Sequence, residues 1–273
     1  MDPTEAAPAK LNLALHLRRR RGDGYHDLET VFAFTEFGDS LSVAAAVGLS
    51  LQVHGRFAAA AGQGADNLVL RAARALAAAA GIAADAALTL EKRIPVAAGL
   101  GGGSADAAAA LRLLNRFWGL GWPTTRLIGI AAALGADVPA CIGSRTCFGS
   151  GRGEQLAEWP SPLAGTPVLL VNPGVAMATG PVFAGWDKID RGPIAPGAPL
   201  ETLRNDMTAA ATAIAPVIAD VLRALAATKG ATLARMSGSG ATCFALFADA
   251  AARDAAAIRL TAGGWWTSAT RLA

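Results

Sequence analysis

The sequence predicts an α+β fold of two domains, and three observations lead to that prediction. The chain has 273 residues, a length that suits one large domain or two ordinary ones. Strand-like and helix-like segments alternate, but without the regular βαβ spacing of a doubly wound sheet. From about residue 145 the composition shifts, and residues 150–199 are rich in Gly and Pro. We therefore expect an N-terminal domain over residues 1–155 and a C-terminal α+β domain over residues 156–273.

The N-terminal half opens with a clear strand pattern. Residues 10–17 alternate leucine with other residues, which predicts a strand whose leucines share one face while Lys10 and Asn12 share the other. A helix follows over 66–80, with Asp66 as its candidate N-cap and a glycine closing it. The polar face of the first strand is open to two interpretations, a reactive surface or the solvent side of a sheet.

The remaining elements follow from the same periodicities. We expect, in chain order, a strand over 87–94, a helix over 104–117, a helix from a Thr124 cap to Gly135, a strand at Pro167–Val171, helices near 200–213 and 215–228, strands at Ala231–Met236 and Ala241–Phe247, an Ala-rich helix and a final strand.

Composition excludes several classes of protein. Hydrophobic residues make up 53% of the chain and charged residues 16%, which rules out a disordered polymer. No stretch approaches the ~20 uninterrupted apolar residues that a membrane helix requires. The N-terminal MDPTEAAPAK has no apolar core, so we expect no signal peptide and a cytosolic (cytoplasmic) protein.

The positive charge is local. The net charge is +3, and four of the 24 Lys and Arg lie in the run Arg18, Arg19, Arg20 and Arg21, so the rest of the chain is nearly neutral. A nucleic-acid-coating surface is therefore not expected. The run suits a compact anionic ligand, and the alternative is a solvated loop without a ligand.

Cysteine and histidine do not form a metal or disulfide pattern. The three cysteines lack CxxC spacing, and buried free thiols explain them (Cys141, Cys147, Cys243). The three histidines are scattered, so we expect no dedicated metal site built from side chains (His16, His26, His54).

A glycine-rich segment is the strongest chemical signal. Residues 95–108 read PVAAGLGGGSADAA and lead directly into a predicted helix whose first turn holds Ser104 and Asp106. Glycines let backbone N–H groups surround an anion, and a helix N-terminus adds positive charge, so the segment favours phosphate binding. It is neither a Walker A loop nor a dinucleotide fingerprint. The alternative is a glycine turn capped by Ser104.

Two further features offer chemistry. The turn Met236–Thr242 is glycine-rich, although a flexible hairpin explains it equally well. Asp137 in Gly-Ala-Asp-Val-Pro is either a turn former or the carboxylate that takes a proton during phosphoryl transfer, with Lys10 as the cation.

Four motifs in order resemble the GHMP kinase superfamily: PAKLNL from Pro8, GYHDL from Gly24, the glycine segment and GSGAT from Gly238. The resemblance spans Pro8 to about Phe247. It implies a two-domain α+β fold with a cleft between the domains. The GYHDL block and GADVP point to the branch that phosphorylates, with ATP, the 2-hydroxyl of a cytidine-diphosphate-linked methylerythritol in isoprenoid precursor biosynthesis.

The resemblance also implies site residues. Asp137 would be the base and Lys10 its partner, while Tyr25 and Phe183 would sandwich the cytosine and His26 would bond its edge. Asn12 and Thr179 would contact the rest of that substrate. ATP, carrying Mg²⁺, would be bound by Asn67, Leu68, Pro95, Gly99, Leu100, Gly101, Gly102, Gly103, Ser104 and Ala105, with Ser104 near the metal-bound oxygens.

Two departures from the family pattern stand out. Asp106 occupies a position where many members have Asn, which brings a charge toward the phosphate segment. The arginine run is longer than the pattern expected there, and whether it contacts the substrate diphosphate is left open, as is the oligomeric state. The rivals are another GHMP enzyme, such as a mevalonate, homoserine or sugar kinase, and a non-catalytic nucleotide- or RNA-binding protein.

Overall fold

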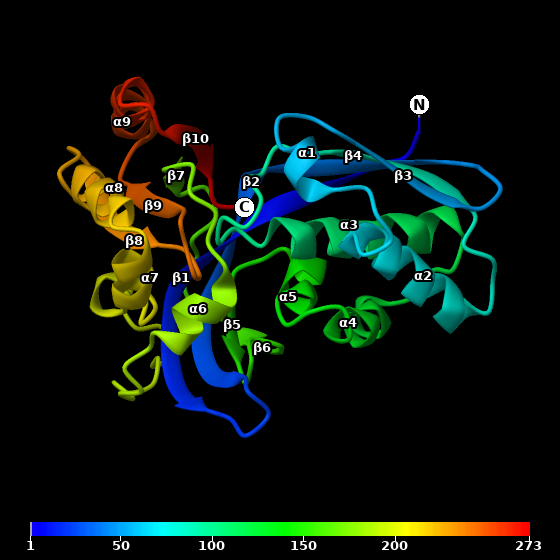
Figure 1. Cartoon of the computed structure of the whole chain (residues 1–273), viewed down its shortest axis with the longest axis horizontal. Helices are drawn as coiled ribbons and strands as arrows, with labels where there is room; N and C mark the ends of the chain where they lie inside the picture. The colour runs from blue at the N-terminus through cyan, green and yellow to red at the C-terminus, as the bar shows by residue number, and fades with distance from the viewer. Residues whose placement is uncertain (1) are drawn as a thin grey trace. The chain divides into compact units, whose positions relative to one another are not determined.

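The computed structural model describes residues 2–273 (Figure 1). They form two compact units whose segments alternate along the chain. Unit 1 comprises the described residues up to Lys10, Gly38–Val96 and Gly101–Ser144; unit 2 comprises Leu11–Phe37, Ala97–Leu100 and Arg145–Ala273. Each unit is made of several separate segments of the chain, so the units do not test a boundary between two continuous domains. The division predicted between residues 155 and 156 therefore stays a prediction.

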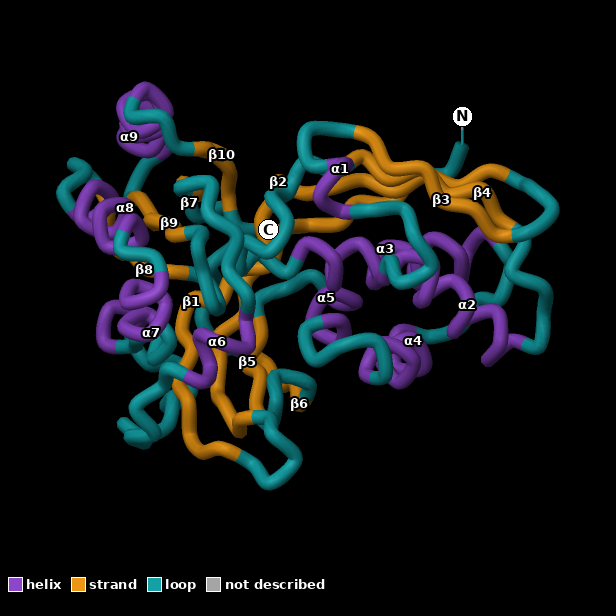
Figure 2. Tube along the Cα trace, in the orientation of Figure 1, coloured by secondary structure: helices purple, strands orange, loops and turns teal. Residues whose placement is uncertain are grey.

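Unit 1 packs helices on a small sheet. Strand β3 (Leu49–His54) pairs in parallel with β4 (Ala86–Glu91), and β4 pairs antiparallel with residues 40–44 of β2 (His26–Ala44). Figure 2 shows helices α2 to α5 gathered on one side of β3 and β4. The helices of unit 1 are α1 (Ala58–Ala61), α2 (Leu68–Ala80), α3 (Gly102–Phe117), α4 (Thr124–Ala132) and α5 (Val138–Gly143).

Alanine explains how these helices pack. Helix α3 is surrounded on most of its circumference, and its residues 107–110 are all alanines with no exposed surface. Small side chains let neighbouring helices approach to the short end of the usual 8–10 Å separation. The alanine excess of the sequence therefore serves close helix packing in unit 1.

Strand β1 (Thr4–Arg20) confirms the alternating pattern and extends it. Its last residue in unit 1 is Lys10 and its first residue in unit 2 is Leu11. Both faces are buried, since Asn12 is 3% and His16 is 1% exposed. The interpretation of the polar face as the solvent side of a sheet is therefore wrong.

Unit 2 is built on a four-stranded antiparallel sheet in the order β10-β7-β9-β8. It also contains the β1–β2 hairpin, on which residues 30–32 of β2 pair with β5. The strands first introduced here are β5 (Cys147–Ser150), β6 (Gln155–Glu158), β7 (Pro167–Asn172), β8 (Ala231–Met236), β9 (Cys243–Phe247) and β10 (Trp266–Arg271). The helices are α6 (Thr179–Ala184), the 3₁₀ turn η1 (Leu200–Thr202), α7 (Thr208–Ile214), α8 (Val217–Ala226) and α9 (Ala250–Ala262).

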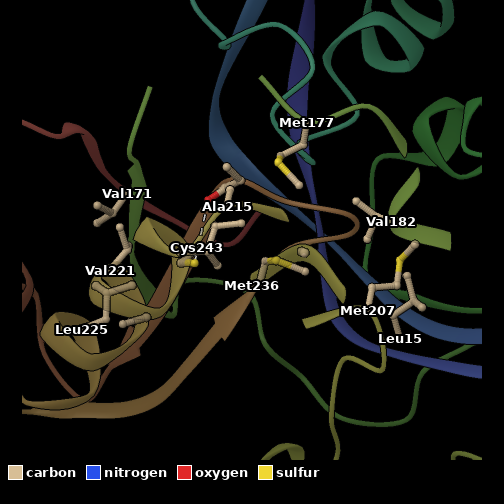
Figure 3. Packing of buried hydrophobic residues seen from close by; sticks show 14 of the residues in the cluster. Leu15, Val171, Met177, Val182, Met207, Ala215, Val221, Leu225, Met236 and Cys243 are labelled. Carbon is tan, nitrogen blue, oxygen red and sulfur yellow. Dashed lines mark hydrogen bonds between the residues drawn. The ribbon is translucent and has the colours of Figure 1, made fainter. Parts of the chain in front are cut away.

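One apolar cluster holds unit 2 together (Figure 3). Val171 of β7 and Cys243 of β9 lie near Val221 and Leu225 of α8, and Met236 of β8 lies next to Cys243 in the same cluster. Val171 pairs with Cys243 and Cys243 with Met236 across neighbouring strands, so their side chains lie on one face of the sheet and form a continuous apolar surface. At about 1.5–3 kcal/mol for each fully buried large apolar side chain, this cluster contributes a major stabilising term for the unit.

The three cysteines are buried free thiols, which confirms the sequence interpretation. Burial raises the pKa of Cys243 to about 12 and, of Cys147, to about 11. Such thiols are unreactive near neutral pH. No helix in the described part of the chain combines the length and apolar character that crossing a bilayer demands.

Helix boundaries correct the sequence predictions at three places. The N-cap of α2 is Asn67, whose side chain accepts a hydrogen bond from the Val69 N–H, and not Asp66. Helix α4 has Pro123 at its N-cap, so Thr124 is its first helical residue and no cap. The helix predicted over 200–213 is divided into η1 and α7, with residues 203–207 between them outside any helix.

The α2 cap gives a first prediction. Because the Asn67 amide satisfies a helix N–H that is otherwise unpaired, Asn67→Ala should lower the free energy of unfolding by about 0.5–2 kcal/mol. Asp66→Ala, one residue away on exposed chain, is the matched control and should change it by less than ~0.5 kcal/mol. Urea unfolding of the two variants measures both, and equal losses would contradict the assignment of the cap.

Candidate active site

An ion pair in unit 1 joins the two residues that the sequence offered for acid–base chemistry. Lys10 of β1 lies with its Nζ 3.1 Å from Oδ2 of Asp137. The lysine side chain is 4% exposed and the aspartate side chain is 34% exposed. Asp137 stands at the N-terminal flank of α5, but its carboxylate does not cap that helix. The carboxylate is thus held by a buried cation and still open to a reactant.

The glycine segment enters α3 beside that pair. Gly101 is the N-cap of α3 and takes the left-handed conformation with φ of 61°, and no side chain caps the helix. A Cβ at Gly101 would lie 2.8 Å from Lys10 Cε, and one at Gly102 would lie 3.0 Å from Lys92 Nζ. Two lysine side chains therefore lie beside the first turn of α3. The N–H groups of a first helical turn have no partner within the helix and are able to bind an anion. Ser104 lies within this turn and is not its cap, contrary to the alternative interpretation.

In unit 2 the second glycine turn packs on the first glycine segment. The Ser237 hydroxyl donates to the Gly99 carbonyl at 2.8 Å and accepts from the Asn12 N–H at 3.1 Å. A Cβ on Gly99, where φ is 76°, would lie 2.3 Å from the Ser237 carbonyl oxygen. Thr242 N–H also donates to Ala98. The turn is thus a packed part of the unit and not a flexible hairpin.

The same turn gathers two predicted substrate contacts. The Asn12 amide donates to the Thr30 hydroxyl at 2.8 Å, and a Cβ at Gly238 would lie 3.1 Å from Asn12 Oδ1. The Thr179 hydroxyl lies 3.2 Å from the Ser239 hydroxyl. Asn12 and Thr179 therefore contact the two sides of one short turn in unit 2.

The aromatic residues predicted to bind the base lie in unit 2, where His26 contacts both Phe183 and Trp186. The sequence did not predict these two ring contacts. His26 stacks on Phe183 with ring centroids 4.9 Å apart and meets Trp186 edge-on at 5.7 Å. Tyr25 is 54% exposed, and the Arg152 guanidinium lies 5.0 Å from its ring centre. Phe183 thus stacks on His26 with the two ring planes 29° apart. The predicted cytosine sandwich between Tyr25 and Phe183 stays a prediction.

Burial, assisted by the charge of Arg20, lowers the pKa of His26. A neutral imidazole can both donate and accept a hydrogen bond, which suits contact with the edge of a base.

Most of the arginine run is neutralised within the protein. Arg18 pairs with Asp190 at 3.1 Å, Arg19 with Asp27 at 2.6 Å, and Arg21 with Asp23 at 3.0 Å. Within residues 2–273, Arg20 makes no ion pair. Three of the four arginines thus have a carboxylate partner within the protein, and no ligand is needed to balance their charge. Their pairing argues against an RNA-binding surface at this run.

Asp106 is not where the sequence analysis expected it. It is the fifth residue of α3 and so lies beyond the first turn, where it is 3% exposed. Its Oδ2 accepts from Lys92 Nζ at 2.6 Å, and the same ammonium pairs with Asp39. Sequence reasoning missed Lys92 and Asp39, and nothing in their local sequence indicates that they meet.

The cluster fixes its own protonation. Burial raises the pKa of Asp106 to about 8, an effect that Lys92 opposes and Asp39 reinforces. Burial alone would lower the pKa of Lys92, but the two carboxylates outweigh it and the pKa is raised. The cluster therefore favours a charged Lys92 and shifts Asp106 toward its protonated form, which lessens the negative charge that the sequence placed near the phosphate segment.

Metal ligands are sparse. No group of three His, Cys, Asp or Glu side chains able to hold an ion occurs over residues 2–273. Magnesium commonly binds proteins through one or two carboxylates together with substrate phosphates and water. Asp106 is committed to Lys92, whereas Ser104 and the partly open Asp137 offer oxygen atoms, so these residues fit an ion that arrives with a nucleotide.

A pH prediction follows from Asp106. Its pKa in the folded protein is raised above the ordinary aspartate value of 3.8, so the folded protein keeps a proton that the unfolded chain releases. This contribution to stability is complete below about pH 4 and is lost, by at most about 1.4 kcal/mol per pH unit, as pH rises toward 8. Asp106→Asn has no such proton, so its free energy of unfolding minus that of the parent should grow from pH 6 to 8 and then level off. Urea unfolding across this range measures the difference, and a pH-independent difference would refute the shift.

Comparisons with known proteins show to which family the chain is similar. The family model described as the GHMP kinases N terminal domain matches residues 67–145, and that for GHMP kinases C terminal matches 193–263. A protein of Rhizorhabdus wittichii named 4-diphosphocytidyl-2-C-methyl-D-erythritol kinase is 57% identical over 100% of this chain and 95% of its own length. A protein of the same name from Sphingopyxis alaskensis is 51% identical over 98% of each chain.

Solved structures show the same likeness. A crystal structure of 4-(cytidine 5'-diphospho)-2C-methyl-D-erythritol kinase is 34% identical, with a TM-score of 0.85 over 99% of each chain. A homoserine kinase from Cytophaga hutchinsonii is 18% identical, with a TM-score of 0.69 over 97% of this chain and 92% of its own. The second likeness concerns the fold alone.

Proposed function

The chain belongs to the GHMP kinase family and is a small-molecule kinase, and from that premise we propose that it phosphorylates 4-diphosphocytidyl-2-C-methyl-D-erythritol. The γ-phosphate of ATP would go to the 2-hydroxyl, giving the 2-phosphate and ADP in isoprenoid precursor biosynthesis. One observation carries the proposal, the buried Lys10 paired with the partly open Asp137, in a chain whose full-length relatives bear the name of this kinase. The reaction consumes ATP, which supports a cytoplasmic setting.

The ion pair supplies the acid–base chemistry. Asp137 would accept the proton of the substrate 2-hydroxyl while the hydroxyl oxygen bonds to the γ-phosphorus. The bond from that phosphorus to the β–γ bridging oxygen would break at the same time, and ADP would leave. Lys10, at 3.1 Å from Asp137, keeps the carboxylate in place and adds positive charge near the transferred group. No phosphoenzyme is required, because the transfer is direct.

The start of α3 supplies the phosphate site in unit 1. The N–H groups of Gly102, Gly103 and Ser104 point along the helix axis and carry partial positive charge. Asn67 and Leu68 open α2 and would contact the adenine, and Pro95, Gly99, Leu100, Gly101 and Ala105 complete the predicted set. Mg²⁺, when bound with ATP, would neutralise charge on its phosphates.

The cytidine end would be recognised in unit 2. Tyr25 offers an open ring face, and base stacking on an aromatic side chain is worth about 1–3 kcal/mol. His26, held against Phe183, would bond the edge of the base. Asn12 lies two residues beyond Lys10, so the two side chains share a face of β1, which suits a contact of Asn12 with the erythritol next to the reacting hydroxyl.

A coupled ADP-release assay tests the proposal. We expect turnover with 4-diphosphocytidyl-2-C-methyl-D-erythritol and none with mevalonate or homoserine at the same concentration. Turnover with one of the other two alcohols instead would favour a different GHMP kinase. RNA binding that falls steeply with salt, without ADP release from any of them, would favour the non-catalytic alternative.

Replacing the base gives a sharper test. Asp137→Asn keeps the shape of the side chain but cannot take the proton, so kcat should fall about 10²–10⁴-fold. Steady-state kinetics at saturating ATP and substrate measure it. Full turnover in this variant would exclude Asp137 as the base, and Glu5→Gln, which alters a different ion pair of β1, serves as the control.

Tyr25 tests the recognition of the base. Because stacking involves only the cytidine substrate, Tyr25→Ala should raise KM for that substrate about tenfold and leave KM for ATP nearly unchanged. Tyr25→Phe keeps the ring and should behave as the parent. Equal increases in both KM values would refute the stacking role.

A further inference from the structure

Three side chains meet in the interior of unit 1 beside the glycine segment. Asp39 comes from β2, Lys92 follows the last residue of β4, and Asp106 belongs to α3. Their side chains are at most 4% exposed. Lys92 donates to both carboxylates, so the three elements are tied together by one ammonium group.

Asp39 does more than pair with a lysine. Its Oδ1 accepts the backbone N–H groups of Arg93 and Ile94, the latter at 2.8 Å, while Oδ2 accepts from Lys92. Hydrogen bonds to an ionised carboxylate are roughly twice as strong as neutral ones. One carboxylate thus fixes the residues that lead directly into Pro95 and the glycine segment.

Lys92 carries this restraint to the other end of the segment. Its ammonium reaches Asp106, the fifth residue of α3, at 2.6 Å, and lies so close to the first turn that a Cβ at Gly102 would be 3.0 Å away. Residues 95–101 are therefore held before and after by groups that converge on Asp39.

This geometry also gives Lys92 a structural role. A lysine beside a glycine segment is an obvious candidate for a phosphate ligand, but this ammonium is 3% exposed and has two carboxyl partners. Separating a buried charge from such partners is strongly destabilising. The N–H groups at the start of α3 are left to face the anion.

We propose that Asp39 is a positioning residue for ATP. It acts through the N–H groups of residues 93 and 94 and through Lys92, and it holds both ends of the glycine segment in the phosphate-binding shape before the nucleotide arrives. A segment that had to be ordered on binding would lose affinity by the entropy of ordering it. The inference rests on the proposed function only in that the nucleotide is ATP.

Asp106 is the less important of the two carboxyl groups for this purpose. Its Oδ1 has no hydrogen-bond partner, and its contact with the segment runs only through Lys92. An amide oxygen at this position can still accept from Lys92. Asp106→Asn should therefore bind nucleotide as the parent does.

The experiment is ADP binding by isothermal titration calorimetry, with CDP as the second ligand. Asp39→Ala should weaken ADP binding tenfold or more and leave CDP binding within twofold, because the proposed cytidine contacts are in unit 2. Asp39→Asn should recover ADP binding to within threefold, because its amide oxygen still accepts from residues 93 and 94. Glu5→Gln, which removes charge from another ion pair of unit 1, should change neither affinity by more than twofold.

Three outcomes would overturn the inference: parental ADP affinity in Asp39→Ala, equal losses for ADP and CDP, or the same loss in Glu5→Gln. If Asp39→Ala does not fold, the double variant Lys92→Met with Asp106→Leu removes the tie to α3 and keeps the backbone bonds of Asp39. It should bind ADP three- to tenfold more weakly, with CDP unchanged, and parental ADP binding would overturn the inference. A parent that binds ADP but not CDP counts against the proposed substrate and leaves the role of Asp39 standing.

Discussion

A buried lysine needs an anion, and in unit 1 this requirement is met by Asp137 for Lys10. Removing an ammonium group from water costs several kcal/mol unless a carboxylate stands close by, so the pairing fixes β1 against the start of α5. The same contact leaves one side of the carboxylate accessible. Gly101 then has to be glycine, since a side chain there would displace the lysine. The Lys10–Asp137 ion pair therefore serves both the packing of unit 1 and the proposed acid–base chemistry.

The periodic patterns of the sequence predicted the helices and strands well. The residue types expected at helix ends predicted the positions of those ends poorly. The leucine alternation of β1 and the glycines before α3 are strong signals because each follows from the geometry of a whole segment. Asp66 and Asn67 are both good caps by composition, and only the backbone angles decide that the Asn67 side chain reaches the Val69 N–H. The exact residue at which a helix begins therefore could not be predicted where two adjacent residues were both suitable caps.

The candidate site divides in the same way. Lys10, Asp137 and the glycine segment belong to local motifs, so residue type and spacing were enough to single them out as candidates, and the structure pairs Lys10 with Asp137. Asp39 and Lys92 are 53 residues apart, and the Arg18 partner Asp190 is 172 residues away, so no local pattern connects them. Asp106 is an example. Its position in the sequence suggested a charge near phosphate, but its distant partners Lys92 and Asp39 hold it in the interior instead.

The interleaving of the two units has a consequence for how the protein is made. Leu15, Leu17 and Leu28 of the β1–β2 hairpin belong to the apolar cluster of unit 2, whose other members begin at Leu169. A ribosome delivers the hairpin first, so these leucines stay without their partners until more than half of the chain has been synthesised. Contacts over such separations slow folding. We therefore regard the nascent hairpin as the stage at which this chain depends most on chaperones and is most exposed to aggregation.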